Sequence, residues 1–390
     1  MERSDELVAK AVSLQPLLRE HAARIDAERR LPDTVIDAVT EAGLFRLATP
    51  KRYGGHESGL RTTVDVLAAL AEGDGSTAWV VGLIGACNWM TGLFPTRAQD
   101  EVYGEDPDSR VTGVLSPTAT SRRTGEGWRV SGRWSYNSGS WHAQWALVGI
   151  PITDDGQNVV GQGLALMPRD DFDIEETWFV AGLRGTASNT LVAQDVLVPD
   201  HRVLSVPDAI EGRYPTEHGE EALYRSAFVP VLSLVLAGAP LGLARAALRY
   251  VMDRAATKPV TYTSYAAQAD SPAVQAQIAR AALGIDTAHL HLRRAAQDID
   301  DAARQGRYPD RLARARARAD TGWAVQHAVE AVNTLVTVYG AAAFADASPL
   351  QRMWRDVNVA GRHAFVVSAV TEELYGRALL GISENITPLI

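Results

Sequence analysis

The first part of the chain shows the apolar spacing of amphipathic helices. Residues 5–29 carry apolar side chains at i, i+3, i+4 and i+7, which predicts a helix; these are Leu7, Val8, Ala11, Leu14, Leu17 and Leu18. A second helix is expected over residues 31–42, where Gly43 ends it, and a third starts at Asp74 and continues through Trp89. Residues 1–109 are therefore predicted to form an N-terminal helical domain.

Between residues 110 and 215 the apolar positions recur every second residue instead of at helical spacing. Residues 128–136 alternate apolar and polar side chains, as a half-buried strand does. Three further short runs are rich in apolar or β-branched residues and are bounded by Gly, Pro or Asp: 145–151, 163–167 and 189–198. We expect a central antiparallel β domain. No Gly-x-Gly-x-x-Gly follows a strand and opens a helix, so the sequence does not support a Rossmann nucleotide site.

Long helical periods return from residue 216 to residue 390. Helices are expected at 221–256, 271–305, 309–340 and 348–381, and together they predict an antiparallel four-helix bundle. We expect a solvated face or a subunit contact at a cluster of arginines, Arg311, Arg314, Arg316 and Arg318. The predicted fold class is thus α+β, mostly α.

The composition of the chain excludes several kinds of binding partner and favours one cellular location. The net charge of −9 argues against a nucleic acid or an anionic membrane as partner. The single cysteine, Cys87, excludes an internal disulfide framework, and no His/Cys cluster has the spacing of metal ligands, so we expect no metal. The acidic first residues lack the apolar core of a signal peptide, and a cytoplasmic location is expected.

Two apolar runs, residues 78–94 and 227–244, are close to the minimum length for a membrane span. Asn88 interrupts the first run, and Pro230 and Pro240 interrupt the second. We expect both runs to be buried helices.

The most informative stretch covers residues 348–363, Ser-Pro-Leu-Gln-Arg-Met-Trp-Arg-Asp-Val-Asn-Val-Ala-Gly-Arg-His. Ser348 and Pro349 are typical of a helix start. The helical spacing of its apolar residues predicts one buried stripe, formed by Leu350, Met353, Trp354 and Val357. A surface helix with charge pairs would account for the same spacing.

This stretch resembles the Arg-Asp helix of the acyl-CoA dehydrogenase superfamily, and the resemblance extends over nearly the whole chain. Common dehydrogenases of that superfamily carry a catalytic Glu at the position of Ala364, and alanine cannot abstract a proton. The Arg-His-Ala ending is similar instead to the oxygenase components of two-component flavin monooxygenases built on this fold. The Ser138-Gly139 pair, His142 and the run Trp-Ala-Leu-Val-Gly at 145–149 are similar to them as well.

This resemblance implies a reduced-flavin-dependent monooxygenase. It would take reduced FAD, or reduced FMN, from a separate NAD(P)H:flavin reductase and react it with O2 to a C4a-hydroperoxide. One oxygen atom would enter an electron-rich aromatic or heteroaromatic, indole-like substrate. Phenol-hydroxylating members place a His next to the equivalent of Trp89, where this chain has Cys87 and Asn88. The resemblance also implies a homotetramer.

Three alternatives stay open at this point. The chain could be an acyl-CoA dehydrogenase whose base lies on another helix. It could be an amino-sugar N-oxygenase, which uses the same cofactor chemistry in a polar pocket. It could also be a non-catalytic member that binds flavin or another ligand.

The resemblance also assigns site residues. His363 is the leading acid–base candidate because imidazole titrates near neutral pH, and the Ser138 hydroxyl is expected to bond the flavin N5. The expected cofactor-binding residues are Ser116, Trp134, Ser138, Gly139, Arg184, Ser188 and Arg355. The expected substrate-binding residues are Trp89, Asn88, Trp141 and His142. Each assignment has a purely structural alternative. Ser138 could belong to a simple β-turn, and His363 could cap a helix end. Arg184 and Ser188 could brace the domain interface, and Trp89 could be an ordinary core residue.

Overall fold

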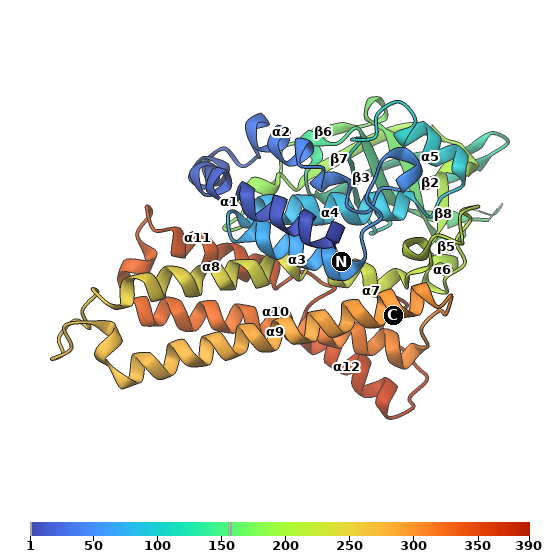
Figure 1. Cartoon of the computed structure of the whole chain (residues 1–390). Coiled ribbons are helices and arrows are strands. Elements are labelled where there is room, and N and C mark those ends of the chain that lie inside the picture. Colours follow the sequence, from blue (N-terminus) through green and yellow to red (C-terminus); the bar gives the residue numbers. More distant parts are fainter. Residues whose placement is uncertain (1, 155, 157) are drawn as a thin grey trace.

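The computed structural model describes residues 2–154, 156 and 158–390, and the chain runs through three parts in the predicted order (Figure 1). N-terminal helices lie beside two β-sheets, and long C-terminal helices extend beneath both (Figure 1). The N-terminal helices are α1 (Glu2–Glu28), α2 (Asp33–Glu41), α3 (Leu60–Ala71), α4 (Gly75–Thr91) and α5 (Thr96–Tyr103).

Helix α4 is the central element of the N-terminal part. Its N-cap is Asp74, whose carboxylate accepts a hydrogen bond from the Thr77 amide at 2.7 Å. Every residue of α4 except Leu83 is buried, because α3, α8 and β1 all pack against it. The apolar run at residues 78–94 is therefore a core helix, as predicted.

The central strands form two four-stranded sheets within the described residues, in the orders β1-β4-β5-β8 and β2-β3-β7-β6. Their bounds are β1 (Val111–Val114), β2 (Ala119–Thr124), β3 (Gly127–Asn137), β4 (Trp145–Thr153), β5 (Val159–Pro168), β6 (Asp173–Glu175), β7 (Asn189–Val198) and β8 (Val203–Ser205). The prediction of a purely antiparallel domain is wrong for one pair, since β1 and β4 are parallel. The hairpin β2–β3 provides the crossover that returns the chain in the same direction.

The C-terminal part comprises α6 (Val206–Ile210), α7 (Phe228–Leu234), α8 (Gly238–Ala255), α9 (Pro272–Arg304), α10 (Arg311–Tyr339), α11 (Pro349–Ala360) and α12 (Ser368–Leu379). Two of the predicted bundle helices are broken. The helix expected at 221–256 is divided because Pro240 lacks the N–H that would continue it toward residue 236. The helix expected at 348–381 ends at Gly361 and restarts as α12, so two short helices take the place of the fourth.

The arginine cluster at the start of α10 is not simply solvated. Arg314 and Arg318 are only 7% and 3% exposed, which corrects the expected solvated face. They lie four residues apart on one side of the helix, and the guanidinium of Arg318 lies 5.2 Å from the centre of the Phe365 ring. A two-residue repeat of arginine on a helix necessarily directs some of them inward.

One stretch of the described chain, Phe228–Ala255, is apolar and long enough to cross a membrane. Its most apolar window is 89% buried within the protein, so it forms core, as predicted for residues 227–244.

Helix α11 ties the three parts together. Arg355 donates to the carboxylate of Asp26 on α1, with N–O distances of 2.9 and 3.1 Å. The buried carboxylate of Asp356 accepts from the amide of Leu183, in the loop between β6 and β7, at 2.6 Å. A Cβ atom on Gly182 would lie 2.3 Å from the carbonyl oxygen of Arg355, so only glycine permits this approach.

The close approach of Gly182 to α11 gives a first prediction. Gly182→Ala should lower the free energy of unfolding by about 1–3 kcal/mol, because the added methyl group overpacks a backbone contact. Gly376→Ala is the control, since nothing lies within 4 Å of its Cβ position in α12 and alanine favours helix. Urea unfolding followed by circular dichroism measures both; equal effects would contradict the packing argument.

A second prediction concerns the pH dependence of stability. Burial raises the pKa of Asp356 to about 7, so the folded chain keeps this proton between about pH 4 and pH 7, where an unfolded chain loses it. Stability should therefore fall as the pH rises through this window. Asp356→Asn cannot titrate and keeps an oxygen for the Leu183 amide, so its unfolding free energy should fall less steeply. Parallel curves for the two proteins would refute this role of Asp356.

Candidate active site

The turn after β3 places Ser138 against helix α4. The indole N–H of Trp79 donates to Ser138 Oγ at 3.2 Å, and both side chains are buried. Gly139 has φ +76°, a conformation that favours glycine, and its amide donates to the carbonyl oxygen of Thr186 at 2.8 Å. The turn is thus fixed both to α4 and to the loop that precedes β7.

A cluster of buried hydroxyl groups surrounds Ser138. Its Oγ lies 2.8 Å from Ser188 Oγ, which in turn lies 2.7 Å from Thr186 Oγ1. Thr186 Oγ1 donates to the carbonyl oxygen of Leu183 at 2.8 Å. Leu183 and Ala187 have φ of 51° and 44°, which non-glycine residues rarely adopt and which often marks functional loops.

The imidazole of His363 also lies near Trp79. The two ring centroids are 5.9 Å apart, and the Phe365 ring lies at the same distance from the imidazole. Burial lowers the pKa of His363 to about 4, so the ring is neutral at pH 7. Its Nδ1 accepts from the Phe365 amide at 3.3 Å, which assigns the ring proton to Nε2.

Trp79 therefore connects Ser138 with His363, although they are far apart in the sequence. The sequence singled out Trp89 on the same helix and missed Trp79. The signal was available, since Trp79 lies in the first turn and a half after the Asp74 cap, but a helix that is buried on all sides has no periodicity to distinguish its faces.

Comparison with known proteins identifies the family. Models of the acyl-CoA dehydrogenase N-terminal and C-terminal domains match residues 11–105 and 234–368. Oxygenase subunit HsaA of a flavin-dependent monooxygenase from Rhodococcus jostii is 32% identical over 95% of this chain and 97% of its own. The chain belongs to the oxygenase components of two-component flavin-dependent monooxygenases with the acyl-CoA dehydrogenase fold.

Two further relatives agree with this family. The oxygenase component of the FADH2-dependent resorcinol hydroxylase from Rhizobium sp. is 32% identical over 96% of this chain and 94% of its own. The structure of XiaF from Streptomyces sp., in complex with FADH2 and glycerol, superposes with a TM-score of 0.94. The two sequences are 35% identical, and the superposition covers 99% of this chain and 98% of XiaF.

The residues around Trp79 fit the ring of the family's flavin. They offer a hydroxyl, indole and imidazole groups that are uncharged at pH 7, as an aromatic ring with amide-like edges requires. The lone pairs on Ser138 Oγ allow it to accept one further hydrogen bond. The structure thus brings Ser138, Gly139, Ser188 and His363 together around Trp79, and their roles stay predictions.

Other expected cofactor residues are placed differently. Trp134 lies in the core between the two sheets and donates to the carbonyl oxygen of Gly149 at 2.8 Å, so its indole is already bonded. Arg355 is held by Asp26, and Arg184 lies half-buried with its Nε 3.9 Å from the same carboxylate. Ser116 is exposed beyond the end of β1. Of the two arginines, Arg184 makes the longer contact with Asp26, so it is the better candidate to meet a phosphate.

Two of the four expected substrate residues, Trp89 and Asn88, lie away from Ser138 and have structural partners. Trp89 lies about 15 Å along α4 from Trp79, ten residues at 1.5 Å each, and its indole donates to the Leu223 carbonyl oxygen. Asn88 bonds the Phe45 carbonyl oxygen and the Val111 amide at 3.1 and 3.2 Å.

The remaining two lie beside the Ser138 turn. The Trp141 side chain is 41% exposed. His142 has a buried Nε2 without a partner among the described residues, and burial lowers its pKa to about 4.

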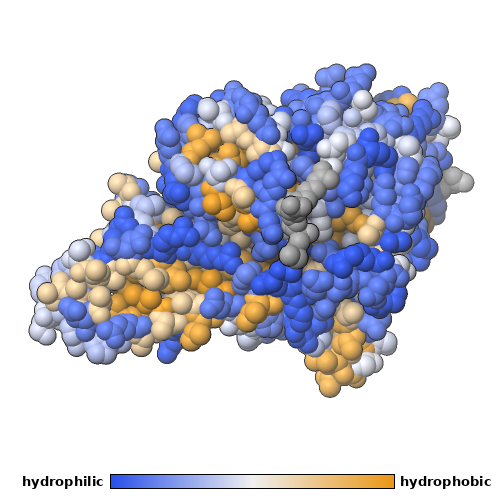
Figure 2. Space-filling view, in the orientation of Figure 1, coloured by the Kyte–Doolittle hydropathy of each residue, from blue (hydrophilic) through white to orange (hydrophobic). Residues whose placement is uncertain are grey.

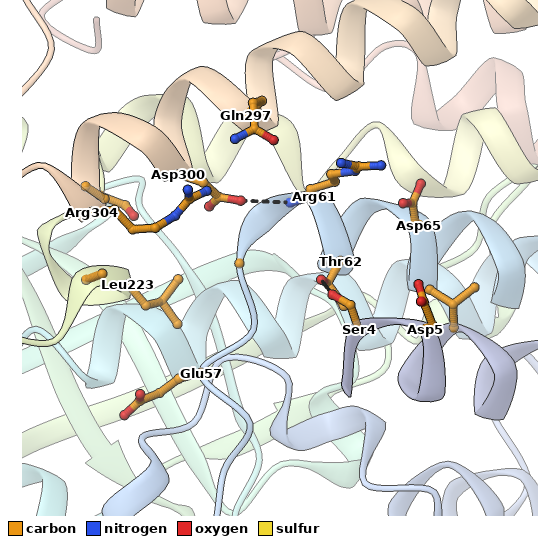
Figure 3. Close-up of a pocket in the computed structure, with 15 residues that line it drawn as sticks. Ser4, Asp5, Glu57, Arg61, Thr62, Asp65, Leu223, Gln297, Asp300 and Arg304 are labelled. Carbon is orange, nitrogen blue, oxygen red and sulfur yellow. Dashed lines mark hydrogen bonds between the residues drawn. The ribbon is translucent and has the colours of Figure 1, made fainter. Parts of the chain in front are cut away.

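A separate polar cavity lies between α1, α3 and α9 (Figure 3). Its volume is about 630 Å³, and its lining includes Asp5, Asp65, Arg61 and Asp300. The Asp300 carboxylate accepts from the Leu60 amide at 2.9 Å and so caps α3 from another helix. Neither Ser138 nor His363 lines this cavity, and its charged walls do not suit an aromatic ring.

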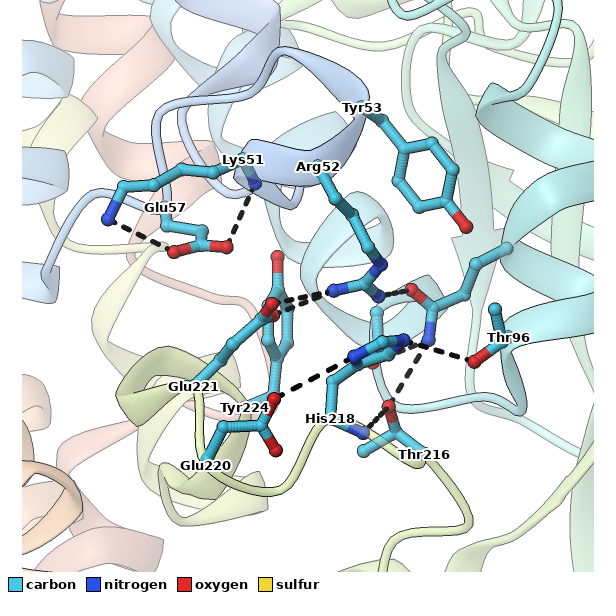
Figure 4. A network of polar contacts seen from close by, with 12 residues as sticks. Lys51, Arg52, Tyr53, Glu57, Thr96, Thr216, His218, Glu220, Glu221 and Tyr224 are labelled. Atoms are coloured by element: carbon cyan, nitrogen blue, oxygen red, sulfur yellow. Dashed lines mark hydrogen bonds and ion pairs between the residues drawn. The ribbon is translucent and has the colours of Figure 1, made fainter.

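A polar network joins the loop at residues 51–57 to the segment before α7 (Figure 4). Arg52 donates to both oxygens of Glu221 at 2.9 and 2.8 Å. His218, Glu220 and Glu221 are close enough to share a metal ion. Because Arg52 already neutralises Glu221, this group acts as a structural link between the two segments.

The contacts of Asn88 give a prediction that separates structure from substrate binding. Asn88→Ala should destabilise the oxygenase by about 2–4 kcal/mol, because it leaves a buried carbonyl oxygen and a buried amide unpaired. Urea unfolding measures the loss, and substrate affinity should change little at low temperature. A large loss of affinity with unchanged stability would instead support the substrate role assigned from the sequence.

Proposed function

We propose that this oxygenase hydroxylates an electron-rich aromatic or heteroaromatic ring with reduced FAD and O2. A separate NAD(P)H:flavin reductase would supply the reduced flavin, with reduced FMN as the alternative form. The observation that supports this best is the position of Trp79, which contacts both Ser138 and His363. The hydroxyl group would hydrogen-bond the flavin ring and the imidazole would move a proton, which are the two roles that the proposed reaction gives to protein side chains.

The bound flavin would activate O2, and the protein's residues would control protons and water around it. Ser138 Oγ would hold the N5 edge of the ring. His363, with its proton on Nε2, would direct that N–H toward the oxygen that develops negative charge during transfer. Trp79 and Phe365 flank the imidazole with apolar surface, which would keep water from this proton.

The weakness of the available bases supports the choice of substrate class. With pKa values of about 4, His363 and His142 are poor bases for a phenol. The Cys87 thiol is buried with its pKa raised to about 12, and Asn88 cannot accept a proton at neutral pH. An indole-like ring, which is nucleophilic without deprotonation, therefore suits this site better.

A phenol is the second candidate. The name of one relative, the resorcinol hydroxylase, states a phenolic substrate, and that relative covers 96% of this chain. A phenol would have to enter as its anion or transfer its proton through His363 during the reaction.

We also propose a cytoplasmic homotetramer. The long helices expose apolar side chains, including Leu283 and Leu290 of α9, each 67% exposed, and Trp323 of α10 at 39%. Figure 2 shows apolar surface over these helices, at the lower left of the view. Surface of this kind is typical of subunit contacts.

Rapid mixing tests the proposed function. Protein with reduced FAD, or separately reduced FMN, is mixed with O2, and absorbance is followed by stopped flow. A transient species that absorbs between the reduced and oxidised forms is expected in the wild type. Ser138→Ala should shorten its lifetime at least about tenfold, and His363→Gln should lower product yield by about 10²-fold while peroxide accumulates.

The control is His21→Gln, because the half-buried His21 lies on α1 and has no hydrogen-bond partner among the described residues. It should leave transient and yield unchanged. Indoles and resorcinol, tested side by side in this assay, distinguish the two substrate candidates. Reoxidation at the rate of free flavin, without a transient, would refute the proposed function.

A further inference from the structure

The hydroxyl groups beside Ser138 form a chain with two unlike ends. At one end is the Trp79 indole, which can only donate a hydrogen bond, and it donates to Ser138 Oγ. At the other end is the Leu183 carbonyl oxygen, which can only accept, and it accepts from Thr186 Oγ1. Ser138, Ser188 and Thr186 lie between them with O–O distances of 2.8 and 2.7 Å.

These ends determine the direction of the whole chain. Each hydroxyl has one proton. Thr186 gives its proton to Leu183, so Ser188 must give its proton to Thr186, and Ser138 must give its own to Ser188. In this direction Ser138 has no proton left for a ligand and meets it only as an acceptor.

We infer that Thr186 and Ser188 are positioning residues that make Ser138 an acceptor and so bias the site toward reduced flavin. This inference rests on the proposed function, in which Ser138 faces the flavin N5. A reduced flavin carries a hydrogen on N5 and donates it, whereas the N5 of an oxidised flavin has a lone pair and must accept.

The chain can be reversed, and the cost of reversal gives the size of the bias. Oxidised flavin would need Ser138 to donate, so Ser188 would turn to Ser138 and Thr186 would turn to Ser188. The hydrogen bond from Thr186 to Leu183 would then be lost. One hydrogen bond of this kind corresponds to about a fivefold difference in binding. Leu183 would keep its bond from the Trp178 indole at 2.9 Å, so the reversal costs no more than this one bond.

The experiment compares the dissociation constants of oxidised and reduced FAD, the latter measured anaerobically, in the intact protein. Thr186→Val and Ser188→Ala should each allow Ser138 to donate its proton to a ligand. In Thr186→Val, Ser188 loses Thr186 as an acceptor and donates to Ser138 instead. In Ser188→Ala, Ser138 loses the acceptor to which it donates. Both should lower the preference for reduced FAD about fivefold. The reduction potential of bound FAD should fall with it, a readout that does not depend on hydroxylation.

Two variants serve as controls. Thr186→Ser keeps the hydroxyl and should restore the wild-type preference. Ser140→Ala removes a buried hydrogen bond to the Ala187 carbonyl oxygen, at 2.8 Å, between the same two loops but outside the chain. It should leave the preference unchanged, which excludes general loosening as the cause.

The outcomes separate the two hypotheses. Suppose that the wild type binds reduced FAD but Thr186→Val and Ser188→Ala keep the wild-type preference for it. The directed chain is then refuted and the proposed function stands. The same holds if Ser140→Ala lowers the preference for reduced FAD as much as these two variants do. If the wild type has no preference for reduced FAD, the directed chain is refuted as well. If the wild type binds neither reduced FAD nor reduced FMN, the proposed function itself fails. Thermal unfolding of each variant confirms that it is folded, and Thr186→Val suffices if Ser188→Ala does not fold.

Discussion

The hydrogen bond from the Leu183 amide to the buried Asp356 carboxylate is the constraint on which the site depends. It joins α11 to the loop before β7 across a sequence separation of 173 residues. Leu183 is held there at φ 51°, and the next five residues carry Thr186 and Ser188. Because burial raises the pKa of Asp356 to about 7, this hydrogen bond contributes about 0.5–1.5 kcal/mol while the acid is neutral and about 1.5–3 kcal/mol once it is charged, which is comparable with the cost of the strained Leu183 conformation. The position of Ser138 therefore depends on an acid that has no contact with it.

The sequence predicted features of the fold that depend on residues close together in the chain, such as the start of a helix. The start of α11 at Ser348 and Pro349 agrees with the structure because proline fits the first turn of a helix, where its missing N–H costs no hydrogen bond, even though the Ser348 side chain makes no capping bond. The end of α11 at Gly361 was not predicted, since the expected helix continued to residue 381. The parallel pairing of β1 with β4 could not be predicted, since alternation of apolar and polar residues says which face is buried and not which strand is the neighbour. The break before α8 could have been predicted from Pro240 alone.

The site was predictable where a motif carried it and not where two distant residues meet. Ser138 and His363 both lie in recognisable stretches, yet nothing in the sequence indicates that both are close to Trp79. Arg355 illustrates the converse difficulty. An arginine next to a cofactor site has the same sequence whether it binds a phosphate or, as here, the carboxylate of Asp26.

Burial is the dominant electrostatic effect around the site. It lowers the pKa of His363 and His142 and raises that of Cys87, so each group is uncharged at pH 7. Ion pairs such as Arg355–Asp26 lie instead on α11 and α1, behind the loop at residues 181–189. A site of neutral donors and acceptors can direct a proton but cannot create a strong base. In the proposed function the reactivity of the ring would therefore come from the substrate itself, and the direction of each hydroxyl would be the protein's means of control over the flavin.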